Sequence, residues 1–316
     1  MKTNHQQNLL AAALTLACAL ALSSSKAQNR PVFDASLTLA DNDAVTASGG
    51  GTTNEAVTPG DEGTAKDEAA QKAELAKKLQ NPVADLISVP IQNNWDFGIG
   101  PADAMRYTAN IQPVVPVSIS QDWNVIIRTI LPVIYQGALD NTPGAPASVG
   151  ESHSGLGDTT QSFFLSPKAP WHGWIWGAGP VGYYPTATDS ALGAGKWGVG
   201  PTVVALRQEH GFTYGILANQ IWSVAGWSDQ YISATYLQPF LSYTTKTYTT
   251  CFVNSETTYN WRTDEATAPI NVGAQQLLKI HKQIIALEVG YRYYIEKPSG
   301  GPDWGLRFQI IFLFPK

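Results

Sequence analysis

Charged side chains recur on the polar face of segments in which polar and apolar residues alternate. They are Arg128, Arg207, Lys279, Glu288, Arg292 and Arg307. A period of two is the pattern of a β-strand, which directs successive side chains to opposite faces. If such strands enclose a lumen, these charges point into it, and rings of charge select ions in pores.

Two of these arginines lie in the last hairpin of the sequence. A hairpin that pairs symmetrically about its loop would place Arg292 opposite Arg307, with Glu288 one pleat further in. Like charges facing each other are unfavourable unless an anion or an acid joins them. The pattern therefore leaves two interpretations open: a basic rung that selects anionic solutes, or an internal salt-bridge network that fills a narrow barrel.

Catalytic chemistry has little support. His153, Ser154 and Asp158 lie close together in a loop region, but they are not arranged on a strand face as a nucleophile and its base would be. The five histidines form no group with ligand spacing, so we predict no metal site. We expect no catalytic residues, no cofactor and no enzymatic activity.

A glycine-rich stretch at Gly177–Gly182 matches a dinucleotide-binding fingerprint in its letters. That motif needs a helix whose N-terminus faces the pyrophosphate. Pro180 and the β-forming pair Tyr183 and Tyr184 leave no such helix. Small residues in a crowded barrel wall explain the stretch better.

Composition favours a membrane protein built from strands. Charged residues make up only 14% of the 316 residues, well below the usual quarter. The mature chain nevertheless has no run of roughly 18 apolar residues that could form a transmembrane helix. A net charge of −5 without a basic stretch argues against nucleic acid as a partner. Cys251 is the only cysteine beyond the leader, so no internal disulfide is expected.

The N-terminal quarter divides into three segments. Residues 1–27 have the basic start, apolar run and small-x-small ending of a secretory signal peptide; a lipid anchor at Cys18 is the less favoured alternative. Residues 28–64 have the composition of a disordered linker. Residues 65–81 carry Glu68 with Lys72 and Glu74 with Lys78 at helical spacing, which predicts a short periplasmic helix.

Residues 82–316 carry all ten tryptophans and all thirteen tyrosines. Alternation and turn residues predict about twelve strands there: 86–98, 106–119, 123–136, 155–165, 174–185, 196–208, 212–225, 230–243, 248–259, 269–280, 284–295 and 304–314. Their length suits a tilted bilayer crossing. Short links after even strands and long links after most odd ones are typical of an outer-membrane barrel. The fold class is therefore all-β, a transmembrane antiparallel up-and-down β-barrel.

Aromatic residues near strand ends fit the two girdles of a membrane barrel. The tryptophans predicted at the membrane interface are Trp95, Trp123, Trp174, Trp197, Trp261 and Trp304. The last segment, Trp304–Phe314, alternates strongly and should pair with the first strand to close the wall. Aromatic residues packed inside a soluble β-sandwich are the alternative.

Several stretches resemble a Gram-negative outer-membrane transporter family, related to the meta-pathway phenol degradation-like barrels and often mislabelled as neuromedin U. The similarity lies in residues 81–84 and 86–90, 92–96, 110–116, 237–240 and 305–309. It covers about three quarters of the chain, from Asn81 to the end, and leaves out the linker. The resemblance implies a barrel with a transport role and carries no known substrate or catalytic residues.

From these observations we expect a barrel in the bacterial outer membrane that allows passive passage of small solutes, with anionic and aromatic solutes as the candidates. A closed barrel with a structural or ligand-binding role, and an exported soluble β protein with an apolar cavity, remain alternatives. The expected partners are outer-membrane lipid, the barrel-assembly machinery and an unidentified small-molecule solute.

Overall fold

The computed structural model describes residues 61–140, 147–281 and 283–315. The helices are α2 (Asp61–Leu79) and α3 (Ala147–Gly150). The strands are β1 (Ile87–Ile99), β2 (Ala104–Ile111), β3 (Val114–Ser118), β4 (Trp123–Gln136), β5 (His153–Leu156), β6 (Thr159–Pro167), β7 (Trp174–Tyr184), β8 (Lys196–Glu209), β9 (Phe212–Gly226), β10 (Ser233–Thr244), β11 (Thr249–Ser255), β12 (Thr257–Asn260), β13 (Glu265–Ile280), β14 (Gln283–Glu296) and β15 (Trp304–Phe314).

These fifteen segments build a closed antiparallel barrel of twelve wall strands, because β2 with β3, β5 with β6, and β11 with β12 each form one interrupted strand. Neighbours in sequence pair with each other around the wall. Strand β15 pairs with β1 in unbroken register, from Phe314 opposite Ile87 to Trp304 opposite Phe97. The predicted fold class and the predicted closing pair are therefore confirmed. The largest boundary difference is at β13, which begins at Glu265 rather than at residue 269.

Each of the three interruptions lies beside a proline and carries an inward polar residue. Gln112 precedes Pro113 between β2 and β3, and Asp158 lies between β5 and β6, opposite Pro132 of β4. Proline has no N–H to give to the ladder, so pairing stops there. Gln112 and Asp158 are both buried. The register with β4 shifts by one residue at Asp158, as at a β-bulge, whereas it is unchanged across Gln112.

The third interruption, between β11 and β12, is at Glu256. The register with β10 is the same on both sides of it, from Phe240 opposite Asn254 to Leu237 opposite Thr257, and Pro239 lies in the unpaired gap. On the other neighbour, β13, Pro269 lies at the gap, where the register with β14 shifts by one residue. Proline has no N–H to donate, so the two prolines explain why the ladder is interrupted at Glu256.

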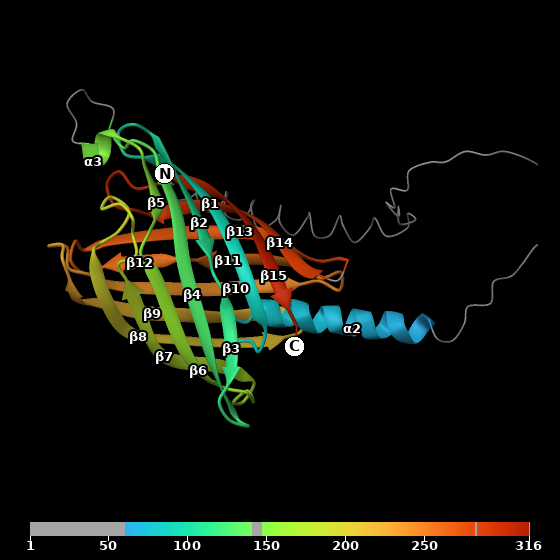
Figure 1. Cartoon of the computed structure of the whole chain (residues 1–316). Helices are drawn as coiled ribbons and strands as arrows, with labels where there is room; N and C mark the ends of the chain where they lie inside the picture. The colour runs from blue at the N-terminus through green and yellow to red at the C-terminus, as the bar shows by residue number, and fades with distance from the viewer. Residues whose placement is uncertain (1–60, 141–146, 282, 316) are drawn as a thin grey trace, which may run out of the picture.

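The two ends of the barrel differ. At one end, where α2 and the C-terminus lie (Figure 1), the links between wall strands are mostly short: 119–122, 168–173, 210–211, 245–248 and 281–282. At the other end they are mostly longer and include α3: 100–103, 137–152, 185–195, 227–232, 261–264 and 297–303. We call these the helix end and the loop end. The asymmetry is that of outer-membrane barrels, whose short turns face the periplasm.

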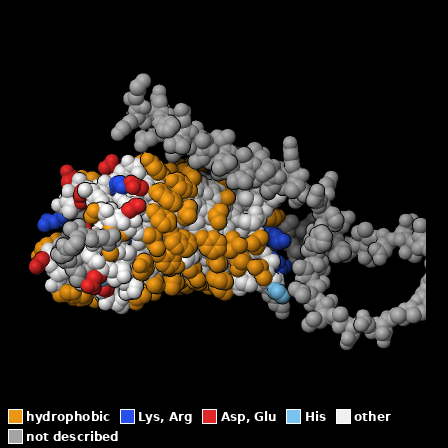
Figure 2. Space-filling model, turned by 90° about the horizontal axis from the view of Figure 1, so that it is seen from above, with side chains coloured by type: hydrophobic (Ala, Val, Ile, Leu, Met, Phe, Trp, Pro, Cys, Tyr) orange, Lys and Arg blue, Asp and Glu red, His pale blue; other side chains and the backbone are white. Residues whose placement is uncertain are grey.

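The outer face of the wall is apolar around its middle. Figure 2 shows a hydrophobic belt, with acidic side chains gathered at the loop end and basic ones at both ends. The belt contains outward side chains such as Leu165, Val203, Ile216, Leu237, Val289, Tyr291 and Leu306. Neither helix in the described part of the chain is long and apolar enough to cross a bilayer. A closed wall of tilted strands with this belt is an outer-membrane barrel.

The inside of the wall is apolar at the helix end and polar in the middle. One buried cluster, the first apolar patch, comprises Leu277, Ala286, Ile311 and Leu313 of β13 to β15. Another, the second apolar patch, comprises Ile126, Phe164, Val204, Leu206 and Leu217 of β4, β6, β8 and β9. Both depart from the predicted rule of apolar outside and polar inside.

The N-terminal predictions are only partly within the described residues. The signal peptide at 1–27 and the linker up to residue 60 lie outside them. The helix predicted at 65–81 is α2, which begins at Asp61 and ends at Leu79. The last residues assigned to the linker, 61–64, therefore belong to the helix, whose start had no capping signal strong enough to fix it.

Candidate functional site

The centre of the lumen is held by one carboxylate and two guanidinium groups. Arg307 donates from Nη1 to Glu256 Oε1 at 2.9 Å and from Nη2 to Oε2 at 2.7 Å. Arg292 Nη1 lies 3.4 Å from Glu256 Oε2. Two parallel bonds to one carboxylate form the strongest geometry available to an arginine. Glu256 is thus the acid that joins the two arginines of the last hairpin.

A second set of acceptors completes this network. Asn94 Oδ1 accepts from Arg292 Nη1 and from Arg307 Nε, both at 2.8 Å. Arg292 Nε lies 3.2 Å from Asp96 Oδ1, close enough for an ion pair although the N–H is not aligned for a hydrogen bond. Tyr294 donates to the same Asp96 oxygen at 2.8 Å. Arg106 of β2 lies directly opposite Asp96 in register, so Arg106, Arg292 and Arg307 share the two carboxylates Asp96 and Glu256.

A row of amide side chains connects Arg128 to the opposite side of the wall. Arg128 Nη2 donates to Gln112 Oε1 at 2.9 Å, and Gln112 Nε2 donates to Gln92 Oε1 at 3.1 Å. Gln92 Nε2 in turn reaches Gln309 Oε1 at 3.5 Å. Asn110 adds a further donor to Gln92 Oε1 at 3.3 Å. The guanidinium at one end orients every amide in the row, because its N–H groups can only donate.

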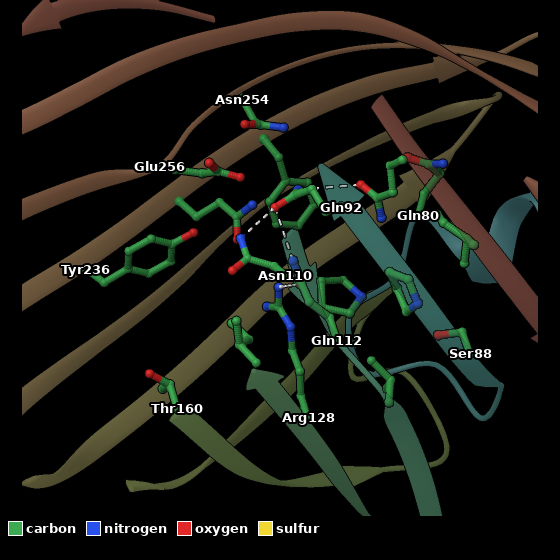
Figure 3. Close-up of a pocket in the computed structure, with 18 of the residues that line it drawn as sticks. Gln80, Ser88, Gln92, Asn110, Gln112, Arg128, Thr160, Tyr236, Asn254 and Glu256 are labelled. Carbon is green, nitrogen blue, oxygen red and sulfur yellow. Dashed lines mark hydrogen bonds between the residues drawn. The ribbon is translucent and has the colours of Figure 1, made fainter. Parts of the chain in front are cut away.

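These side chains surround a cavity of about 620 Å³. Figure 3 shows Arg128 extending from its strand toward Gln112, with Tyr236 and Glu256 on another side of the cavity. Its polar lining includes Gln80, Gln92, Asn110, Gln112, Arg128, Asn219, Gln238, Asn254, Glu256, Gln275, Glu288, Arg307 and Gln309. The lining runs from Lys78 near the helix end to Ala194 and Ile232 near the loop end. The space is large enough for a small organic solute.

Arg128 differs from the other lumen arginines. Within the described ranges, no carboxylate lies within 4 Å of its guanidinium, and Gln112 is its hydrogen-bond partner. It is also more exposed to the cavity than Arg292 and Arg307, which are 7% and 4% exposed. Glu288 is a buried carboxylate in the same lumen, and its side chain accepts a hydrogen bond from Gln275 Nε2 at 3.3 Å.

The structure brings four of the six predicted lumen residues inside: Arg128, Glu288, Arg292 and Arg307. The other two predictions are wrong. Arg207 lies on the outward face of β8, two residues from the exposed Glu209 that it pairs with at 3.1 Å. The parity of this strand was misjudged because its inner face near the helix end carries apolar Val204 and Leu206.

Lys279 has the inward parity of β13 but lies at its very end, where its side chain is exposed beside α2. The assumed register of the last hairpin is also corrected. Arg307 lies opposite Gly290, and Arg292 lies opposite Gly305, so the two arginines are diagonal neighbours rather than a facing pair. They converge on Glu256 from adjacent positions.

The predicted interface tryptophans lie toward the two ends of the wall. Trp123 and Trp174 begin β4 and β7 at the helix end. Trp197 and Trp304 begin β8 and β15 at the loop end, and Trp261 directly follows β12 there. Trp95 points outward from β1 and packs on Tyr107 with ring centroids 5.2 Å apart. Their girdle role follows from these positions as an expectation.

Sequence reasoning missed Glu256, Asn94 and Asp96. A signal for the two acids was present: within the predicted strands the only acids are Asp96, Asp158, Glu256 and Glu288. A carboxylate in a membrane strand is tolerated on the lumen side and excluded by lipid on the other. Each of the four is indeed directed inward. Which arginine each acid joins could not be read from the sequence, because that depends on register.

His153, Ser154 and Asp158, which lie close together in the sequence, make structural contacts rather than a catalytic group. His153 Nδ1 lies 2.9 Å from Asp189 Oδ2, while Ser154, the next residue of β5, points to the opposite face. Asp158 accepts from Tyr183 OH and from the amides of Ala187 and Ala194. Within the described ranges, no group of three or more His, Cys, Asp or Glu residues could hold a metal ion.

The loop that receives His153 is fixed by its own backbone. The amide of Ala191 donates to Asp189 at 2.8 Å, and this bond together with His153 holds the pKa of the Asp189 carboxyl below its usual value. The pair is half-buried, at the loop end of the barrel. It anchors the 185–195 connection to β5.

Comparison with known proteins finds similar folds among outer-membrane barrels of known structure. No protein-family model matches the chain, and no curated protein sequence matches it significantly. An outer-membrane channel from Pseudomonas putida F1 superposes with a TM-score of 0.55 at 16% identity, covering 72% of this chain and 94% of the channel. Outer membrane phospholipase A from Escherichia coli superposes with a TM-score of 0.41 at 12% identity, over 78% and 98% of the two chains. At such identities the likeness concerns the fold alone.

Proposed function

We propose that this protein is an outer-membrane channel through which small polar solutes pass without a chemical step. The observation that carries the proposal is the polar cavity of about 620 Å³ enclosed by a wall whose outer face is apolar. Amide side chains that line a lumen can exchange hydrogen bonds with a passing solute at little net cost. We also propose that the barrel-assembly machinery inserts the chain and that lipid covers the belt.

The preferred solutes are anions, and Arg128 is the residue that selects them. The guanidinium groups of Arg292 and Arg307 lie at ion-pair distance from Glu256 or Asp96, which reduces their field in the cavity. Arg128 faces the cavity without a carboxylate at ion-pair distance among the described residues. An uncompensated guanidinium in a narrow lumen attracts anions and raises their local concentration. Aromatic solutes are compatible with Tyr236, Phe240 and Phe252 in the same lining.

The test is the reversal potential of single channels in planar bilayers under a KCl gradient. The wild-type channel should prefer chloride, and Arg128→Gln should reduce or remove that preference. Arg207→Gln is the matched control, because it removes the same charge from the outer face. If Arg128→Gln and the control give the same reversal potential as the wild type, Arg128 does not set selectivity.

A barrel that is permanently closed is the second candidate function. It is favoured by one observation: residues 75–86 lie across the helix end and contact both apolar patches. Such a protein would have a structural or ligand-binding role. Liposome swelling with small sugars and carboxylates separates the two candidates, since a permanently closed barrel gives no swelling above that of empty liposomes.

A further inference from the structure

Residues 75–86, which we call the plug, cross the barrel at the helix end. They comprise the last turn of α2 and the connection to β1. The helix stops at Leu79, before Asn81 and Pro82, and a turn follows in which the amide of Ala84 donates to Asn81 O at 3.2 Å. Proline cannot continue the helix. The turn redirects the chain from one side of the lumen to the other.

Both ends of the plug pack on the first apolar patch. Leu75 and Ala76, in the last turn of a helix that otherwise projects from the barrel (Figure 1), are 4% and 3% exposed. Ala84 and Leu86 join the same cluster. A helix end that fills an apolar pocket of the wall is not expected of a flexible tether.

The middle of the plug packs on the second apolar patch, across the lumen. Val83 is 5% exposed and lies in one cluster with Ile126, Phe164, Val204, Leu206 and Leu217. It also lies against Gly177 of β7: a Cβ added to this glycine would be 3.3 Å from Val83 Cγ1. The glycine-rich stretch at 177–182 therefore makes room for Val83 at its first position.

Two polar contacts hold the plug between these patches. Gln80 Nε2 donates to Gln275 Oε1 at 2.6 Å, and Gln275 in turn donates to Glu288. Gln208 Nε2 of β8 donates to Lys77 O at 2.8 Å, which satisfies one of the free carbonyls at the end of the helix. The plug is thus bonded to β8 on one side and to β13 on the other.

The wall is built to receive the plug. Aliphatic and aromatic side chains form two inward clusters at the helix end, whereas a mouth filled with water would be lined with polar groups throughout. Removing the plug exposes both patches to water, which is unfavourable in proportion to their area. The plug also supplies part of the cavity lining, including Lys78, Gln80 and Asn81.

We propose that the plug is a gate that belongs to this chain, and that it must leave the second apolar patch before a solute can cross the helix end. Opening is a swing of residues 75–86 about their covalent attachment to β1. The proposal rests on the channel function proposed above. Closure is held chiefly by Val83 and Leu75, so weakening either contact increases the open fraction.

A disulfide across the second patch tests this gate. Val83→Cys with Gly177→Cys, in a Cys251→Ser background, places two thiols where a Cβ added at Gly177 would lie 3.3 Å from Val83 Cγ1, close enough for a disulfide. Gly177 has no positive φ, so its backbone accepts a side chain. The bond should form in isolated outer membranes and be visible as a reducible shift in gel mobility. Failure of the disulfide to form under a mild oxidant would overturn the position assigned to the plug.

Conductance of the same variant tests the consequence. The oxidised protein should remain closed, and reduction should restore the openings of the Cys251→Ser protein. Val83→Ser and Leu75→Ser should raise the open probability about tenfold, because each removes a buried aliphatic contact. Ala73→Ser is the control, on the exposed face of the same helix, and should leave gating unchanged.

The two proposals fail in different ways. If the oxidised and reduced double-cysteine proteins conduct equally, the gate is wrong and the channel function stands. If the disulfide forms but no variant conducts, including Val83→Ser, the channel function is wrong. In that case the plug remains the closure of a structural barrel, as the disulfide would show.

Discussion

Arg307 and Glu256 are joined by two parallel hydrogen bonds, although they are 51 positions apart in the chain. In the wall, strands β13 and β14 lie between them. Glu256 has the inward parity of its strand, which it shares with Phe252, Asn254 and Thr258 of the cavity lining. The register with both neighbouring strands is unchanged across it. The contact therefore depends on ordinary strand alternation together with the closure of the barrel, which brings β15 within reach.

Replacing Glu256 by Gln should destabilise the barrel strongly. The change leaves Arg292 and Arg307 buried with one fewer counter-charge, and breaking a buried pair typically costs about 3–5 kcal/mol. Urea unfolding in lipid vesicles, followed by tryptophan fluorescence, measures the difference. Glu265→Gln, at the exposed start of β13, is the control. An unchanged midpoint for Glu256→Gln would show that the network does not stabilise the fold.

The same substitution should also strengthen anion preference, in the opposite direction to Arg128→Gln. Without Glu256 the lumen gains one net positive charge, so the reversal potential should move toward that of chloride. The measurement uses the bilayer assay described for Arg128. A shift toward cations would contradict the charge balance assigned to the network.

Gly179→Ala should impair folding. A Cβ at this position would lie 1.9 Å from Phe163 O, so β6 and β7 could not keep their spacing. The expected loss is about 2 kcal/mol or more, as for overpacked sites. Gly290→Ala is the matched control in the same type of wall strand, because its nearest neighbour is 3.3 Å away. Heat-modifiable gel migration compares the two, and equal migration at all temperatures would refute the prediction.

The connection 185–195 should loosen in acid. The pKa of Asp189 is lowered in the folded protein by the Ala191 amide and by His153. This carboxylate therefore stabilises the loop above its unfolded pKa, roughly 3.9, and the contribution is lost as the pH falls through the lower folded value. The protection of the Ala191 amide against hydrogen exchange, relative to its intrinsic rate at each pH, should fall over that window. Asp189→Asn keeps an acceptor oxygen without the charge, so its exchange should lose this step.

Sequence alone was sufficient for the wall. Strong alternation in Trp304–Phe314 and in residues 284–295 reflects lipid on one side and a polar lumen on the other, which the structure confirms for β14 and β15. It was insufficient at the helix end, where inward Val204, Leu206 and Leu277 are apolar because the plug covers them. The alternation rule assumes water inside, and that assumption failed there.

The network at Glu256 required information that local patterns do not contain. Its partners come from β1, β14 and β15, so it depends on the closing pair and on a one-pleat difference in register. We assumed a symmetric hairpin, in which Arg292 lies opposite Arg307. In the structure Arg307 lies opposite Gly290, so the β14–β15 pairing is shifted by two residues from that assumption. Inward acids could be recognised by exclusion from lipid, but their partners could not.

The plug is attached directly to β1, the strand that closes the wall by pairing with β15. The second apolar patch comes from β4 to β9, but the first includes Ile311 and Leu313 of β15, so both patches are present together only when the last strand is in place. During biogenesis the plug, although it precedes the first strand, therefore cannot dock completely until the last strand has paired with β1. Closure of the wall and docking of the plug then occur together, late in assembly.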